Sequence, residues 1–325
     1  MHSQLYRGWM PECVEDAYTS LATYHAAAPG AKATALHIIE ERVNRLIRSQ
    51  PPDECNVAGL SSGFLVDTPT HLARTQALFV YQLVRLFDGD IRARARAETH
   101  IDVLHTWANR MLESARLDCA AAELLSTSPA EQSGMMLLPM SSTTTNDDLF
   151  QVRSTPSTDT AAMSHDGNAL SLPSNPFLLP PHASTPLLWH AWITAESIRR
   201  TYLAATFMQS VYNTLKQGWS ICPGGAAFTA LNGLWDARSG YAWLEVLQSS
   251  LRASTEGGGE GILSKGLSPW ALIQSLEGWR VLEAARPEEV DEFTRAVLEI
   301  SYGVERVEGW CFGHRRGREA GPQGT

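Results

Sequence analysis

The segment LLWHAWITAESIRRTYLAATFMQSVYNTLKQ, residues 187–217, carries the strongest helical pattern in the chain. A Thr-Pro pair at 185–186 precedes it as a cap-like start, and Gly218 follows it as a break. Its apolar residues recur at the spacing that places side chains on one face of an α-helix: Leu188, Trp192, Leu203, Phe207, Val211 and Leu215. The segment therefore predicts one long helix.

Two further features of this helix bear on function. Glu196 lies four residues before Arg200, a spacing that brings opposite charges together on a helix. About 31 residues at 1.5 Å each give a length of about 46 Å, which exceeds the span of a small core. The helix is therefore either a wholly buried central helix or a partly exposed one, on which Trp189 and Trp192 are candidate interaction residues.

The sequence on either side of this segment predicts more helices. Apolar residues with helical spacing occur over 14–28, 31–49, 68–87 and from Asp90 onward, and again over 239–251 and 287–301. In the stretch from Asp90, Ile91, Leu104 and Trp107 are expected to point inward. Five tryptophans are expected to fill the helical core rather than to line a ligand pocket, namely Trp107, Trp192, Trp235, Trp243 and Trp279. No alternating strand pattern persists, so the predicted fold class is all-α.

The composition changes at about Ser126. Residues 126–185 are rich in Ser, Thr and Pro and poor in aromatics, which is typical of a disordered insert. Because the helices on both sides each have one apolar face, residues 1–125 and 186–313 are expected to form one helical regulatory domain. Residues 314–325 are expected to form a flexible basic tail.

A structural corner is expected directly after the long helix. Gly218, Pro223, Gly224 and Gly225 give the backbone the freedom and stiffness to reverse direction. Trp219 and Cys222 are expected to plug the core at this bend, since a reduced cysteine behaves as a small hydrophobe.

Composition excludes several classes of function. The net charge of -9 disfavours contact with nucleic acid and with anionic membranes, so we expect neither as a partner. Five scattered cysteines, odd in number, indicate reduced thiols. The chain shows no apolar run long enough for a membrane helix and no signal peptide.

Short patterns that could suggest catalysis lack the context that catalysis needs. Residues 59–63 match G-x-S-x-G, but no strand leads into them, as a nucleophile elbow requires. His100 and His105 are five apart and point in different directions on a helix, and Asp147-Asp148 lies in the Ser/Thr-rich insert. We therefore expect no enzyme activity, no cofactor, and no catalytic or metal site.

Four stretches carry a resemblance to a known family. They are Leu5–Tyr24, Ala73–Trp107, Leu188–Trp243 and Pro287–Trp310, with WHAWITAESIRRTYLAA and LKQGWSICPGGAAFTALNGLWDA the most distinctive parts. In order and spacing they resemble the regulatory region of the fungal-specific, zinc binuclear-cluster transcription factors.

The resemblance implies a nuclear or nucleocytoplasmic protein of transcription regulation, without the zinc cluster, since the chain has no C-x-x-C. Related factors often serve secondary-metabolite gene clusters. The chain is then a coregulator or decoy acting through contacts with another transcription regulator or with a second copy of itself. The alternatives are a helical module that senses a small-molecule effector, or a truncated zinc-cluster factor whose DNA-binding part is absent.

Overall fold

A computed structural model describes residues 1–49, 66–126, 185–221, 226–256, 272–274 and 277–319. These residues are mainly helical, which confirms the all-α prediction. The helices before residue 127 are α1 (Glu12–Ala26), η1 (Pro29–Ala31), α2 (Lys32–Arg48), α3 (Thr68–Phe87), α4 (Ile91–Glu98) and α5 (Ile101–Ser126). After residue 184 come α6 (Thr185–Gln217), α7 (Gly240–Glu256), α8 (Gly278–Ala284), η6 (Pro287–Glu289), α9 (Glu292–Tyr302) and α10 (Val304–Glu319).

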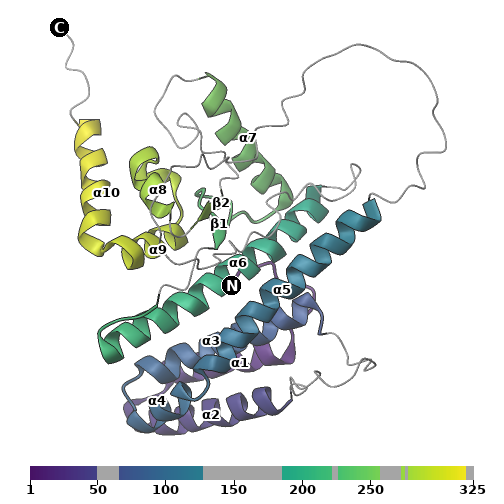
Figure 1. The fold of residues 1–325 in the computed structure, drawn as a ribbon, viewed down its shortest axis with the longest axis vertical. Coiled ribbons are helices and arrows are strands. Elements are labelled where there is room, and N and C mark those ends of the chain that lie inside the picture. Colours follow the sequence, from purple (N-terminus) through teal and green to yellow (C-terminus); the bar gives the residue numbers. More distant parts are fainter. Residues whose placement is uncertain (50–65, 127–184, 222–225, 257–271, 275–276, 320–325) are drawn as a thin grey trace, which may run out of the picture.

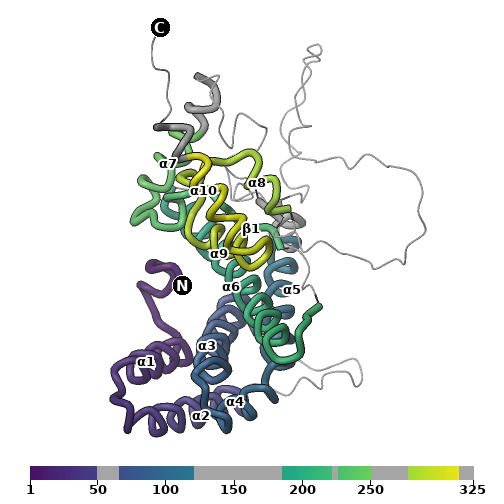
Figure 2. Tube along the Cα trace, turned by 90° about the vertical axis from the view of Figure 1, so that its left-hand side faces the viewer, coloured from purple at the N-terminus to yellow at the C-terminus, as the bar shows by residue number. Residues whose placement is uncertain are grey.

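The central helix α6 lies between two groups of elements (Figure 1). It packs against α3 and α5 on one side and against β1 and α7 on the other. One cluster of buried side chains draws on α3, α5, α6, β1 and α9, including Leu72, Met111, Leu203, Phe228 and Val297. Helices from both sides of residues 127–184 therefore share a core. Seen from the side, α6 again separates α1–α4 from α8–α10 (Figure 2).

Helix α6 is neither wholly buried nor exposed along its whole length, so it combines the two alternatives, a buried central helix and a partly exposed one. Its middle is buried on every face, from Glu196 through Leu203, so that part is a central core helix. Its ends are not, because Leu187 is 59% and Leu215 is 72% exposed. The apolar stripe predicted along the whole helix thus stops before Leu215.

Two helix starts depend on aspartates. The carboxylates of Asp67 and Asp90 accept hydrogen bonds from the amides of Thr70 and Ala93, and so cap α3 and α4. The stretch from Asp90 is two helices rather than one, and at the break the carbonyl of Ala97 accepts hydrogen bonds from the amide of His100 and from the side chain of Gln82 in α3. Leu104 and Trp107 in α5 are buried as expected, but Ile91 is exposed, and the buried residue of α4 is Ala97.

The second group contains a small sheet that the sequence did not indicate. Strand β1 (Ala227–Thr229) pairs antiparallel with β2 (Leu272–Gln274), with Phe228 opposite Ile273. Three-residue strands are too short to show an alternating pattern. Helix α8 was also missed, and the predicted helix over 287–301 is instead η6 followed by α9, which Asp291 caps. Trp279 in α8 is 42% exposed, contrary to the expectation that it fills the core.

The predicted flexible basic tail begins inside a helix. Helix α10 continues through Glu319, and the carbonyl of Trp310 lies within hydrogen-bonding distance of the His314 ring, one helical turn further on. Among the described residues, no helix is both long and apolar enough to cross a membrane. The Ser/Thr-rich insert, the Gly59–Gly63 pattern and Cys222, Gly224 and Gly225 of the corner lie outside the described residues.

Candidate functional site

The carboxylate of Glu196, in the middle of α6, is the centre of a buried cluster of polar side chains. Glu196 is completely buried, and its two oxygens accept hydrogen bonds of 2.9 Å from Nε of Arg199 and from Nε of Arg200. The backbone amide and the hydroxyl of Thr229 in β1 donate two more, at 2.9 and 3.1 Å. The oxygens of Glu196 are thus satisfied from two separate elements, as a buried charge requires.

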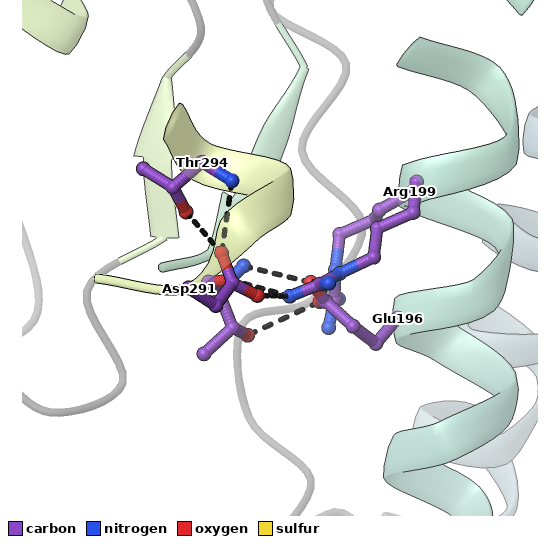
Figure 3. A network of polar contacts seen from close by, with 6 residues as sticks. Glu196, Arg199, Asp291 and Thr294 are labelled. Carbon is purple, nitrogen blue, oxygen red and sulfur yellow. Dashed lines mark hydrogen bonds and ion pairs between the residues drawn. The ribbon is translucent and has the colours of Figure 1, made fainter. Parts of the chain in front are cut away.

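Arg200 extends this cluster from α6 to α9. Its terminal nitrogen donates to the carbonyl of Thr229 at 2.9 Å and to the carboxylate of Asp291 at 2.5 Å. The other oxygen of Asp291 accepts from the amide and hydroxyl of Thr294, at 2.9 and 2.6 Å, in the first turn of α9. Figure 3 shows how these groups meet between the helices. The cluster, which we call the buried ionic network, comprises Glu196, Arg199, Arg200, Thr229, Asp291 and Thr294.

The charges of the buried ionic network balance. Two arginines face two carboxylates, and each of these four side chains is at most 7% exposed. Burial alone would raise the pKa of Glu196, but the charges of Arg199 and Arg200 and the hydrogen bonds from Arg200 and Thr229 together lower this pKa below its usual value. Glu196 therefore stays ionised, and the network joins the C-terminal elements to the central helix.

Aromatic rings cover the guanidinium group of Arg200. Its central carbon lies 4.2 Å from the ring centroid of Trp235 and 4.9 Å from that of Phe293. Such cation–π contacts strengthen when the cation is desolvated. They hold in place the side chain of Arg200, which bonds both to Glu196 of α6 and to Asp291 at the start of α9.

The first residues of the chain lie against the same region. The ring of His2 contacts Trp235 and Trp189 edge-on, with centroids 4.9 and 6.1 Å apart. The hydroxyl of Tyr6 donates to the side chain of Gln76 in α3 at 2.8 Å. Burial lowers the pKa of His2, which keeps this ring neutral.

A pocket of about 560 Å³ opens beside the buried ionic network. Its lining comes from the first residue, α1, α3, α6, the loop after β1 and the start of α9. The lining residues are Met1, Leu21, Gln76, Phe79, Val80, Ser197, Arg200, Thr201, Ala204, Trp235, Asp236, Asp291, Glu292 and Phe293.

A second feature lies at the far end of α6. Gly218 has a φ of +84°, a conformation that favours glycine, and it ends the helix. Trp219 and Ile221 beyond it are 60% and 77% exposed, and the carbonyl of Ile221 accepts a hydrogen bond from Ser210, so the chain folds back along the helix. We call Leu215, Trp219 and Ile221 the α6-end patch. Trp219 does not plug the core as predicted, because Gly218 directs the chain toward solvent.

The structure gathers several of the candidate residues chosen from sequence. Glu196, Arg200 and Trp235 meet in or against the buried ionic network, while Trp189 and Trp192 are buried in an adjoining apolar cluster with Trp243 and Leu247. Trp219 lies apart. Sequence reasoning missed Arg199, Thr229 and Asp291, although an aspartate three residues before a threonine at a helix start is a recognisable N-cap signal for Asp291.

Comparison with known proteins finds a distant similarity to a fungal transcription factor. No family model matches it, and no solved structure matches it. Over 253 residues, 78% of this chain, it is 27% identical to a curated fungal transcription factor. That relative is transcription factor gsfR2 of Penicillium aethiopicum, of which this chain spans 46%.

These comparisons show a distant relationship to a fungal transcription factor, across less than half of that protein's length. Among the residues that the structure describes, no group of three His, Cys, Asp or Glu side chains is arranged to hold a metal ion. The pocket and the α6-end patch are candidate binding features of the part of the chain that the structure describes.

Proposed function

We propose that this chain is a transcription-regulator-like protein that acts through protein contacts, as a coregulator or decoy for a DNA-binding factor. The distant relationship to a transcription factor supports the regulatory setting, including a nuclear or nucleocytoplasmic location. The proposed role in a secondary-metabolite gene cluster rests on the resemblance of the sequence to zinc-cluster factors. The α6-end patch is the observation that supports action through contacts with another protein.

The α6-end patch has the character of an interaction surface. Three large apolar side chains within seven residues are 60–77% exposed at the end of a helix whose middle is fully buried. Tryptophan is enriched among residues that dominate binding energy at protein interfaces. Leu215 lies on the last turn of α6, and Trp219 and Ile221 follow Gly218, where the hydrogen bond from Ser210 to the carbonyl of Ile221 ties the segment to the helix. This tether limits the reordering needed on binding, which lowers the entropic cost of association. The net charge of -9 argues against nucleic acid as the bound surface.

Capture of a DNA-binding regulator tests this proposal. Tagged chain is used to capture full-length zinc-cluster factors of the same fungus, with the triple variant L215A/W219A/I221A as the test. The matched control is Y241A/I300A/F312A, three large apolar residues that are also exposed but lie on α7, α9 and α10. We expect wild type and control to capture a factor, and the patch variant to lose it. A wild-type chain that captures no regulator and is monomeric in light scattering contradicts the proposal.

A second candidate function is the sensing of a small-molecule effector. The pocket of about 560 Å³ supports it, because small-molecule sites in proteins have volumes of about 300–1,000 Å³. The buried ionic network at its wall joins α6 to β1 and α9, so an occupant would touch the elements that hold the two groups together.

A further inference from the structure

The pocket beside the buried ionic network has a mainly apolar interior. Leu21, Phe79, Val80, Ala204 and Phe293 line it from α1, α3, α6 and α9. None of these side chains has a polar group, so they favour the apolar surface of an occupant. Because they come from four helices, the pocket belongs to the assembled domain.

One polar group in the pocket stands out by its surroundings. Ser197 is only 1% exposed, lines the pocket from α6, and its hydroxyl has no hydrogen-bond partner among the described residues. By contrast, the hydroxyl of Thr201, one turn along the same helix, accepts a hydrogen bond from Gln76 at 3.1 Å. Buried hydroxyls are nearly always hydrogen-bonded in folded proteins. Ser197 is thus a group that an occupant can satisfy.

The charges around the pocket decide the charge of the occupant. Arg200 is paired with Glu196 and Asp291, so it has little attraction left for an anion, and the exposed carboxylates of Asp236 and Glu292 lie on the lining as well. Asp291 is satisfied by Arg200 and Thr294, and the carboxylates of Asp236 and Glu292 are exposed to solvent, so a cation in the interior would face Arg200 without a buried counter-charge of its own. Burial of an unpaired charge is unfavourable in either case.

We propose that this pocket binds an uncharged, largely apolar small molecule that exchanges a hydrogen bond with the hydroxyl of Ser197. This inference rests on the sensing candidate and names the chemical class of its effector. It does not involve the α6-end patch, so its failure leaves the protein-contact proposal standing, and the reverse also holds.

Two fluorescent probes that differ by one charged group test the proposal. N-phenyl-1-naphthylamine is uncharged and apolar and carries one N–H, while 8-anilinonaphthalene-1-sulfonate adds a sulfonate to the same scaffold. Each is titrated into the 325-residue chain with a C-terminal tag, because Met1 lines the pocket. We expect saturable binding of the uncharged probe at one site, and binding of the sulfonate at least about ten-fold weaker.

Substitutions locate the binding site. Ala204→Phe fills the pocket and is expected to abolish saturable binding, whereas the matched change Ala191→Phe, at an exposed position of the same helix, is expected to leave binding unchanged. Ser197→Ala removes one hydrogen bond and is expected to weaken binding about three- to ten-fold. Far-UV circular dichroism verifies folding, and if Ala204→Phe does not fold, Ser197→Ala carries the localisation.

Three results would overturn the inference. The wild-type chain could fail to bind the uncharged probe saturably. A folded Ala204→Phe variant, or Ser197→Ala, could bind it as tightly as the wild type does. The sulfonate probe could bind as tightly as the uncharged one, which would remove the argument from charge.

Discussion

Replacing Glu196 with glutamine tests whether the buried ionic network holds the two groups of elements together. Glutamine has almost the same volume, but its amide carries one acceptor oxygen where the carboxylate has two. Glu196 accepts four hydrogen bonds, from Arg199, from Arg200 and from two groups of Thr229. The variant therefore leaves donors unpaired and leaves two buried arginines facing the single charge of Asp291.

The expected cost is large. Removing one partner from a buried ion pair typically destabilises a protein by about 3–5 kcal/mol, because the remaining charge is buried without compensation. Total unfolding free energies are about 5–15 kcal/mol, so E196Q should remove a substantial share of the stability. The measurement is urea-induced unfolding of the wild type and variant, followed by far-UV circular dichroism, with equal slopes required for the comparison.

The same substitution at an exposed ion pair provides the control. Glu277 lies 3.4 Å from Arg280, and both side chains are more than 40% exposed. Such pairs contribute about 0–1 kcal/mol, so E277Q should leave stability almost unchanged. A loss below about 1 kcal/mol in E196Q, or one equal to that in E277Q, would refute the reasoning about the network.

Two further predictions concern stability. Burial, and to a smaller extent the charge of Arg74, lowers the pKa of His71 to about 4. Below pH 6.5 the folded state therefore binds fewer protons than the unfolded state does. The free energy of unfolding of the wild type should then fall by up to about 3 kcal/mol as the pH drops from about 6.5 to about 4. H71Q should show a smaller fall in pH-dependent unfolding, and an equal fall would contradict the assignment to His71. Deletion of residues 130–180 should leave the far-UV helical signal and the thermal transition nearly intact, since helices on both sides share a core; a large loss of either would show that these residues belong to the fold.

The sequence predicted those elements whose side chains repeat with a clear period. Residues 187–217 form most of α6, and Glu196 and Arg200 form the expected pair, because helical spacing alone brings them together. The start of α3 shows the limit of local reading. Thr68 stands directly before Pro69, as an N-cap residue often does, but the preceding Asp67 provides the capping carboxylate.

Features that depend on distant residues could not be predicted. At the break between α4 and α5, the side chain of Gln82 in α3 donates to the carbonyl of Ala97, a contact across 15 positions of sequence. Asp291 meets Arg200 across 91 positions of sequence. The exposure of Trp219 follows from the backbone conformation at Gly218, and a tryptophan in the sequence does not reveal whether it faces core or solvent. The pocket combines residues from opposite ends of the chain, from Met1 to Phe293.

The central claim is that this chain regulates transcription through the α6-end patch, and a transcript profile tests it most directly. Strains of the source organism that lack the gene are complemented with the wild-type chain, with L215A/W219A/I221A or with Y241A/I300A/F312A, at matched protein levels. We predict that deletion changes a discrete set of transcripts, centred on one secondary-metabolite gene cluster, and that the wild type and the control restore them while the patch variant does not. An unchanged profile in the deletion strain, or full restoration by the patch variant, would contradict the claim.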